Sequence, residues 1–156
     1  MKYEGPLPRG NDVKVDITIL ERFVYPLQQR PVLRGYEKFT DIPENCPVQV
    51  YALEEIVAEK TLALADRARN EPRDLYDLWY LTSKTDVGID HLAEAIRQEL
   101  EFRGAPCERI EDAIIRKEAR LKALWSSRLA YQMTKLPSFD EVFRMTRRAL
   151  RQAHLP

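Results

Sequence analysis

Three groups of residues in this chain have types and spacings that could do chemistry. The first is Lys14-Val15-Asp16-Ile17-Thr18, in which polar and apolar residues alternate. On a strand with one buried face, Lys14, Asp16 and Thr18 would lie side by side on the other face. A carboxylate there, with a lysine two residues away, could hold a divalent cation or take a proton from a nucleophile. The alternative is a solvated strand face with a Lys–Asp neighbour pair.

The second group begins at Leu53-Glu54-Glu55 and continues through Lys60 to Arg67. On a helix, Val57, Lys60, Leu64 and Arg67 fall on one stripe, which places two cations in an apolar line. An unpaired buried charge costs several kcal/mol, so these cations must reach solvent, find carboxylates or face a cleft. A cleft that holds phosphates would satisfy both. Salt bridges to glutamates of the same segment are the alternative.

The third group is Pro72-Arg73-Asp74-Leu75-Tyr76-Asp77-Leu78. Asp74 and Asp77 are three residues apart, so both carboxylates point to one side of a helix. Asp74 would also lie in the first turn, where negative charge suits the helix dipole. Asp77 has apolar neighbours and needs a cationic partner, for which Lys60 and Arg67 on the preceding helix are the nearest candidates.

Two strand patterns precede the helices. Val13, Val15, Ile17 and Ile19 alternate with mostly polar residues, which predicts a strand with one buried face. Pro47–Tyr51 predicts a second, shorter strand. The proline-rich loop between them could hold a short extended segment around Val32-Leu33.

From Leu53 onward the apolar period becomes helical. Pro72 interrupts the pattern, because proline disfavours helical geometry in the residue before it. Ser138 is a good N-cap for the last helix, with Glu141 as its capping-box partner. The predicted helices are 53–69, 73–81, 89–102, 109–131 and 138–153. The fold class expected is therefore α+β, with a small N-terminal β-sheet in residues 1–52 and a mainly helical region in 53–156.

Composition excludes some functions. With 25 basic and 25 acidic residues the net charge is zero, which argues against a general nucleic-acid coat but not against a local basic patch. The two cysteines give no disulfide framework, and the two histidines stand alone in polar surroundings. No stretch has the roughly 18 apolar residues of a membrane span, so a cytoplasmic protein is expected.

The three groups, taken in order, resemble the AbiEii/AbiGii nucleotidyltransferase toxin family. The resemblance spans nearly the whole chain. The strings that carry it are Lys14-Val-Asp16-Ile-Thr, Tyr51-Ala-Leu-Glu-Glu55-Ile-Val-Ala-Glu59-Lys60, Arg67 and Arg73-Asp74-Leu-Tyr-Asp77-Leu. Tyr3-Glu4-Gly5-Pro6-Leu7 near the start, and Leu124-Trp125 with Leu129 near the end, are also similar to segments of that family.

The resemblance implies a nucleotidyltransferase core like that of DNA polymerase beta, to which residues 1–52 would contribute strands. It also implies a toxin of a type IV-like toxin–antitoxin pair in phage defence, with Mg²⁺ and an NTP in the site. The acceptor would be tRNA, another RNA or a protein, and a cognate antitoxin would be a partner. By this resemblance Asp16 is a catalytic carboxylate beside the metal and Lys60 contacts the phosphates. Substrate-binding roles would fall to Lys14, Arg67, Arg73, Asp74 and Asp77.

One departure concerns the family's first motif, a Gly-Ser turn followed by Asp-x-Asp, which is absent from residues 1–156. Asp12 and Asp16 would lie about 13 Å apart on a strand, too far to share one metal pair. We therefore expect a fragment, a truncated product or half of a split protein, inactive or incomplete as it stands and prone to dimerise through an exposed strand edge.

Two other hypotheses stay open. One is a non-catalytic module that binds RNA or a partner, for which the arginines of the last helix offer a surface (Arg144, Arg147, Arg148 and Arg151). The other is a plain helical interaction domain whose motif match is coincidence.

Overall fold

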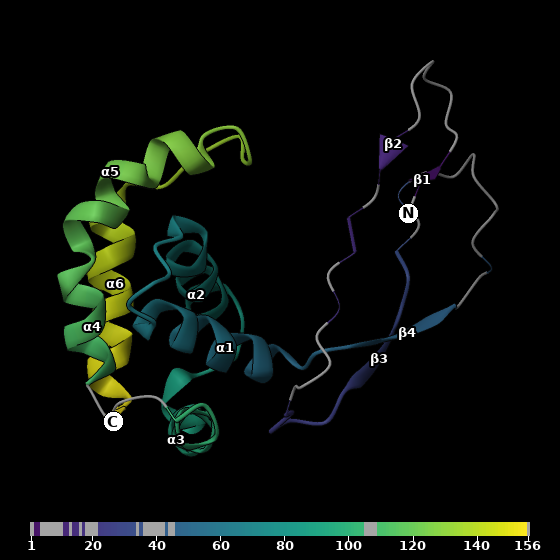
Figure 1. The fold of residues 1–156 in the computed structure, drawn as a ribbon, viewed down its shortest axis with the longest axis horizontal. Helices are drawn as coiled ribbons and strands as arrows, with labels where there is room; N and C mark the ends of the chain where they lie inside the picture. Colours follow the sequence, from purple (N-terminus) through teal and green to yellow (C-terminus); the bar gives the residue numbers. More distant parts are fainter. Residues whose placement is uncertain are drawn as a thin grey trace.

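The helices gather into one body, and the strands extend away from it on the side where helix α1 begins (Figure 1). The structure is a computed structural model that describes residues 2–3, 11–12, 14–15, 17, 22–33, 35, 43, 46–104 and 109–155. Across these residues the fold is α+β with a mainly helical C-terminal region, as the sequence predicts.

Helices α1 (Leu53–Ala65) and α2 (Pro72–Lys84) pack against each other and form the centre of the body. Pro72 is the first residue of α2, a position where its missing N–H has no partner to lose. The turn between these helices is short, which makes them neighbours, as predicted. Helix α1 ends at Ala65, four residues earlier than the sequence predicts.

The rest of the body consists of a 3₁₀ turn, η1 (Ile89–Leu92), and four helices, α3 (Ala93–Phe102), α4 (Ile110–Arg116), α5 (Glu118–Leu129) and α6 (Phe139–Gln152). The single helix predicted over 109–131 is wrong, because Lys117 separates α4 from α5. The predicted cap of α6 is confirmed, since Ser138 Oγ accepts a hydrogen bond of 3.3 Å from the Glu141 N–H.

One hydrophobic core joins these helices. Helix α2 lies between α1 and α6, and α4 contacts both α1 and α6. The side chains that are fully or almost fully removed from water include Val57, Leu64, Leu75, Leu78, Ile96, Ile110, Ile114, Leu121, Leu129 and Val142. Burial of this many apolar side chains is the main stabilising term of the body.

Two short antiparallel hairpins form the β part. Strand β1 (Lys2–Tyr3) pairs with β2 (Asn11–Asp12), and β3 (Gln28–Pro31) pairs with β4 (Pro47–Val50). The predicted strand at 47–51 is thus confirmed in β4. Its partner β3 comes just before the expected extended segment at 32–33, although a backbone bond from Val32 to Cys46 continues the pairing.

The strand predicted over 13–19 is not found at the positions the structure describes. Lys14, Val15 and Ile17 have no strand pairing, and the rest of that segment lies outside the described residues. Val15 is 56% exposed and Ile17 80% exposed, so the prediction that both are buried is wrong. An alternating pattern becomes a half-buried strand only where another surface covers its apolar face, and at the two described apolar positions, Val15 and Ile17, none does.

Glu55 attaches the β part to the helical body. Its buried carboxylate accepts hydrogen bonds from the backbone N–H groups of Val24 (3.2 Å) and Tyr25 (2.9 Å). Tyr25 in turn packs partly against the helical core. The glutamate that the sequence offered as a salt-bridge partner for the cations of α1 therefore holds the chain that leads into the β3–β4 hairpin.

Candidate functional site

Lys60 lies between two carboxylates at the interface of α1 and α2. Its Nζ is 2.9 Å from Asp74 Oδ1 and 2.6 Å from Asp77 Oδ2. The prediction that Asp74 and Asp77 share one side of α2 is confirmed, as is the prediction that Asp77 pairs with a cation of the preceding helix. The Lys60 side chain is 19% exposed and that of Asp77 30%, so solvent reaches the pair from one side.

Asp74 is the buried centre of this network, with only 2% of its side chain exposed. Arg69 donates from Nε to Asp74 Oδ2 at 2.6 Å and from a terminal nitrogen to Oδ1 at 3.2 Å. Burial raises the pKa of Asp74, but the hydrogen bonds from Arg69 and Lys60 outweigh it and hold that pKa below its usual range. Asp74 is therefore an anion that anchors two cations.

Lys117 fixes the turn from which Arg69 extends. Its buried ammonium donates to the carbonyl oxygens of Leu64 (2.6 Å) and Arg69 (2.8 Å), and also to that of Asp66. These carbonyls belong to the last turn of α1 and to the residues just after it, where helical backbone acceptors lack partners and a cation is favourable. Burial lowers the pKa of Lys117, with Asp66 and Asp74 acting in the opposite direction.

The sequence placed a different arginine in this site. Arg67 was expected on the same stripe of α1 as Lys60, but α1 ends at Ala65, and Arg67 lies in the turn with an exposed side chain. Arg69, two residues later, makes the contact with Asp74 instead. A helix boundary error of four residues is sufficient to explain this miss.

Arg73 has no hydrogen bond or salt bridge to the Lys60 network within the residues that the structure describes. It lines a cleft of about 480 Å³ between the start of α2 and the end of α5, together with Glu71, Ser127, Arg128, Leu129, Tyr131 and Gln132. Lys14 is exposed, and Asp16 lies outside the described residues. Of the residues predicted for the site, the structure thus brings together Lys60, Asp74 and Asp77.

An acidic cluster on α1 and α3 was not foreseen. Arg103 forms salt bridges with Glu59 and, at 3.5 Å, with Glu99. The Glu99 carboxyl is buried, and its Oε1 has no hydrogen-bond partner. Burial raises the pKa of Glu99, Arg103 opposes this, and Glu59 and Glu55 raise it further. The helical pattern of the sequence around Glu99 does not predict that this side chain is buried.

The described residues do not form a metal centre by themselves. In the ranges that the structure covers, no three His, Cys, Asp or Glu side chains come together in a way that could hold an ion. The carboxylate expected to bind Mg²⁺, Asp16, is outside those ranges. The network around Lys60 is instead a salt-bridge cluster with two cations and two anions.

Comparison with known protein families shows to which family this chain belongs. The family model described as nucleotidyl transferase AbiEii toxin, type IV TA system, matches residues 2–145. The chain belongs to the AbiEii nucleotidyltransferase toxin family. The match includes both α1 and α2, so the Lys60 network lies within the part of the chain that is shared with the AbiEii family.

Membership of a type IV toxin–antitoxin family implies an antitoxin as a partner. No curated protein and no solved structure matches this AbiEii chain. Among the described helices, none combines the length and apolar character that crossing a membrane requires.

Proposed function

We propose that this AbiEii-family chain takes part in nucleotidyl transfer from an NTP, and that Lys60 is the residue that contacts the nucleotide's phosphates. The observation that carries the proposal is the position of its ammonium, at 2.9 Å from Asp74 and 2.6 Å from Asp77 at a partly exposed edge of the helical body. The family match over residues 2–145 supports the reaction class.

The two carboxylates have different parts in this proposal. Asp74 is buried and also bound by Arg69, so it holds the Lys60 ammonium in place at the interface of α1 and α2. Asp77 is more exposed and is the partner that a phosphate oxygen would replace. An anion-for-anion exchange of this kind leaves Lys60 neutralised before and after binding, which avoids an uncompensated charge at a half-buried position.

The reaction joins an acceptor oxygen to the α-phosphorus of the NTP. The bond from that phosphorus to the bridging oxygen breaks, pyrophosphate leaves, and the acceptor proton passes to a carboxylate, for which we propose Asp16. Lys14, Arg67 and Arg73 are proposed substrate contacts. When bound, Mg²⁺ would help to neutralise the phosphate charge. The acceptor we propose is tRNA, another RNA or a protein. We propose that the reaction takes place in the cytoplasm and serves phage defence.

The Gly-Ser…Asp-x-Asp motif does not occur in residues 1–156. Several carboxylates must converge to hold two metals, and Asp16 supplies one. We therefore propose that these residues transfer nucleotides slowly or not at all by themselves, and that a segment with that motif completes the site.

The test uses each labelled NTP in turn, with Mg²⁺ and either total RNA or protein as acceptor. We expect little labelling by residues 1–156, and labelling once a family segment with the missing motif is joined upstream. In the active form, Asp16→Asn should remove most activity and Lys60→Met should raise KM for the NTP. Lys84→Met, at the exposed end of α2, is the matched control.

Two results would overturn these proposals. Robust Mg²⁺-dependent labelling by residues 1–156 alone would contradict the incompleteness. Unchanged rates and KM in both the Asp16 and the Lys60 variants would contradict the assignment of the site. Because Lys60→Met also removes salt bridges, its folding is checked by circular dichroism before the kinetics are interpreted.

A second candidate is a non-catalytic module that binds RNA or a partner protein. The specific observation in its favour is the row of arginines on α6, which lines a cleft that includes none of Lys60, Asp74 and Asp77. RNA binding with no nucleotide turnover, even after the upstream segment is joined, would favour this function over transfer.

A further inference from the structure

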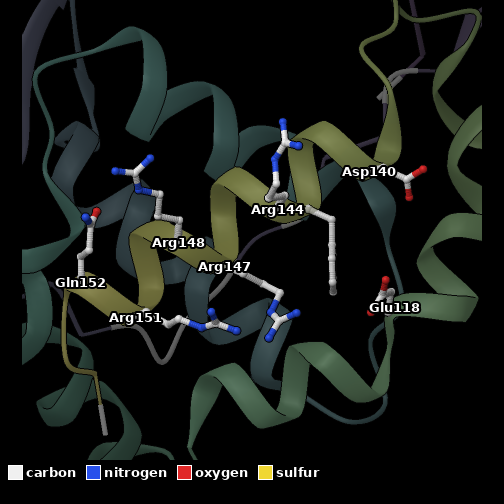
Figure 2. Close-up of a pocket in the computed structure, with 8 residues that line it drawn as sticks. Glu118, Asp140, Arg144, Arg147, Arg148, Arg151 and Gln152 are labelled. Carbon is white, nitrogen blue, oxygen red and sulfur yellow. The ribbon is translucent and has the colours of Figure 1, made fainter.

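Helix α6 has a strongly basic surface, although the chain as a whole is neutral. Residues 143–152 contain four arginines and no acidic residue. Arg144, Arg147, Arg148 and Arg151 all line one cleft of about 550 Å³, which we call the α6 arginine cleft. Their i, i+3, i+4, i+7 spacing places all four on one face of α6, and Figure 2 shows Arg147 and Arg151 extending toward one edge of this face and Arg144 and Arg148 toward the other.

The structure does not neutralise these arginines fully. Arg147 and Arg151 share a single carboxylate, Glu111 of α4, at 3.1 Å and 2.6 Å from the same Oε1 atom. The Arg147 Nε is buried and has no hydrogen-bond partner. Hydrogen bonds from Arg151 and Arg147 lower the pKa of Glu111 against the effect of burial, so one negative charge is shared by two guanidinium groups.

The acidic residues that line the cleft do not neutralise the remaining positive charge of the arginines. Asp140 is bound by Lys122 at 2.7 Å, and Glu118 is the remaining carboxylate of the lining. Glu111 therefore serves Arg147 and Arg151, whereas Arg144 and Arg148 have no hydrogen bond or salt bridge within the part of the chain that the structure describes. Helix dipole effects favour a cation in the last turn, which accounts for Arg151 but not for Arg144 in the second turn.

We propose that the α6 arginine cleft binds the phosphate backbone of an RNA acceptor. This inference rests on the proposed function, of which it names the acceptor class and the surface that holds it. Arg144 and Arg148 are one helical turn apart, about 6 Å along the axis, and Arg147 and Arg151 form a second pair along the other edge of the same face of α6. Such a track suits repeated phosphates along a strand better than one isolated phosphate, and guanidinium groups bind phosphate oxygens in pairs.

The composition of the cleft favours RNA over an acidic protein. Protein interfaces depend on exposed aromatic or aliphatic anchors that enter a pocket of the partner. The aromatic residue of this cleft, Phe143, is buried, with Arg147 stacked on its ring at 5.9 Å. A surface that is polar and positively charged, without an apolar anchor, is typical of nucleic-acid interfaces.

The test measures binding of a fluorescein-labelled single-stranded RNA of mixed sequence by anisotropy, without NTP, across a salt series. Each phosphate contact with a single strand contributes about −0.7 to the slope of log affinity against log salt. Three to four contacts predict a slope of about −2 to −3, and Arg144→Gln/Arg148→Gln should reduce its magnitude by about 1.4 and weaken binding about tenfold at low salt. The control, Lys84→Gln/Arg97→Gln, removes the same charge from exposed positions outside the cleft.

The proposal is overturned if the Arg144/Arg148 variant keeps wild-type affinity and slope, or if both double variants lose affinity equally. It is also overturned if polyglutamate displaces the RNA at equal charge concentration, since that result indicates an acidic protein as the partner. The assay involves no turnover, so arginine-dependent RNA binding by a chain that shows no transfer even after the upstream segment is joined would refute the proposed function and leave this binding surface in place.

Discussion

Replacing Asp74 with asparagine tests whether the Lys60 network is held by a buried anion. Asp74 accepts from Lys60 and twice from Arg69, and 2% of its side chain is exposed. An asparagine would keep one acceptor oxygen, but its NH₂ group would face donors. Removing one member of a buried ion pair costs about 3–5 kcal/mol.

Solvent reduces that figure here, because Lys60 is 19% exposed and Arg69 45% exposed. We therefore expect Asp74→Asn to lower the free energy of unfolding by about 2–3 kcal/mol, and the midpoint of thermal unfolding by about 5–10 °C. The assay is urea unfolding followed by circular dichroism at pH 7. Asp77→Asn, at a carboxylate with 30% exposure, is the matched control and should cost less than about 1 kcal/mol.

The pH dependence gives an independent check. Because the folded pKa of Asp74 is lowered, its stabilising effect is present above the usual aspartate pKa, and it is lost as pH falls through the folded value. The difference in the free energy of unfolding between wild type and Asp74→Asn should therefore be largest at pH 7 and should decrease below about pH 4. An Asp74→Asn variant as stable as wild type at pH 7, or a difference that stays constant down to pH 3, would refute the reasoning.

Three further predictions concern other parts of the fold. Burial raises the folded pKa of Glu99, so the contribution of the Glu99 carboxyl to stability is present at low pH and is lost as pH rises through the folded pKa. In urea unfolding, Glu99→Gln should therefore be more stable than wild type at pH 7 and equally stable near pH 4. Lys117→Met should lower the free energy of unfolding by about 1–3 kcal/mol, because three carbonyls lose a charged donor, whereas loss of the exposed Lys122 should have little effect in the same assay. The chain should dimerise through the β3–β4 hairpin, and Val48→Lys should shift it toward monomer in size-exclusion chromatography with light scattering; a wild-type monomer would contradict this.

The sequence was sufficient to predict the α1–α2 arrangement, because local signals determine it. Pro72 marks the break, the three-residue spacing aligns Asp74 with Asp77, and a short turn makes the helices neighbours. The choice of Arg69 over Arg67 was not predictable in this way, because it depends on where α1 ends, and element boundaries are the least reliable feature of a sequence pattern.

Long-range contacts account for the other differences. Lys117 bonds to carbonyls more than 45 residues earlier in the chain, and no local pattern encodes that contact. A signal was nonetheless present, since Lys117 interrupts a stripe of buried residues at Ile110, Ile114 and Leu121. A cation on an apolar stripe must find acceptors. The exposed Val15 and Ile17 show the converse, because alternation alone does not supply a surface to cover them.

A continuous series of contacts links Lys117 to the candidate site around Lys60. Lys117, between α4 and α5, holds the backbone of the turn after α1, and that turn carries Arg69. Arg69 and Lys60 both bind the Asp74 carboxylate, and Asp77 is the more exposed of the two partners of Lys60. In the proposed function, an incoming phosphate would compete for Lys60 at Asp77, because Asp74 is buried and also bound by Arg69. Exchange in that proposal would involve one carboxylate, and nucleotide binding there would leave the packing of α1 on α2 unchanged.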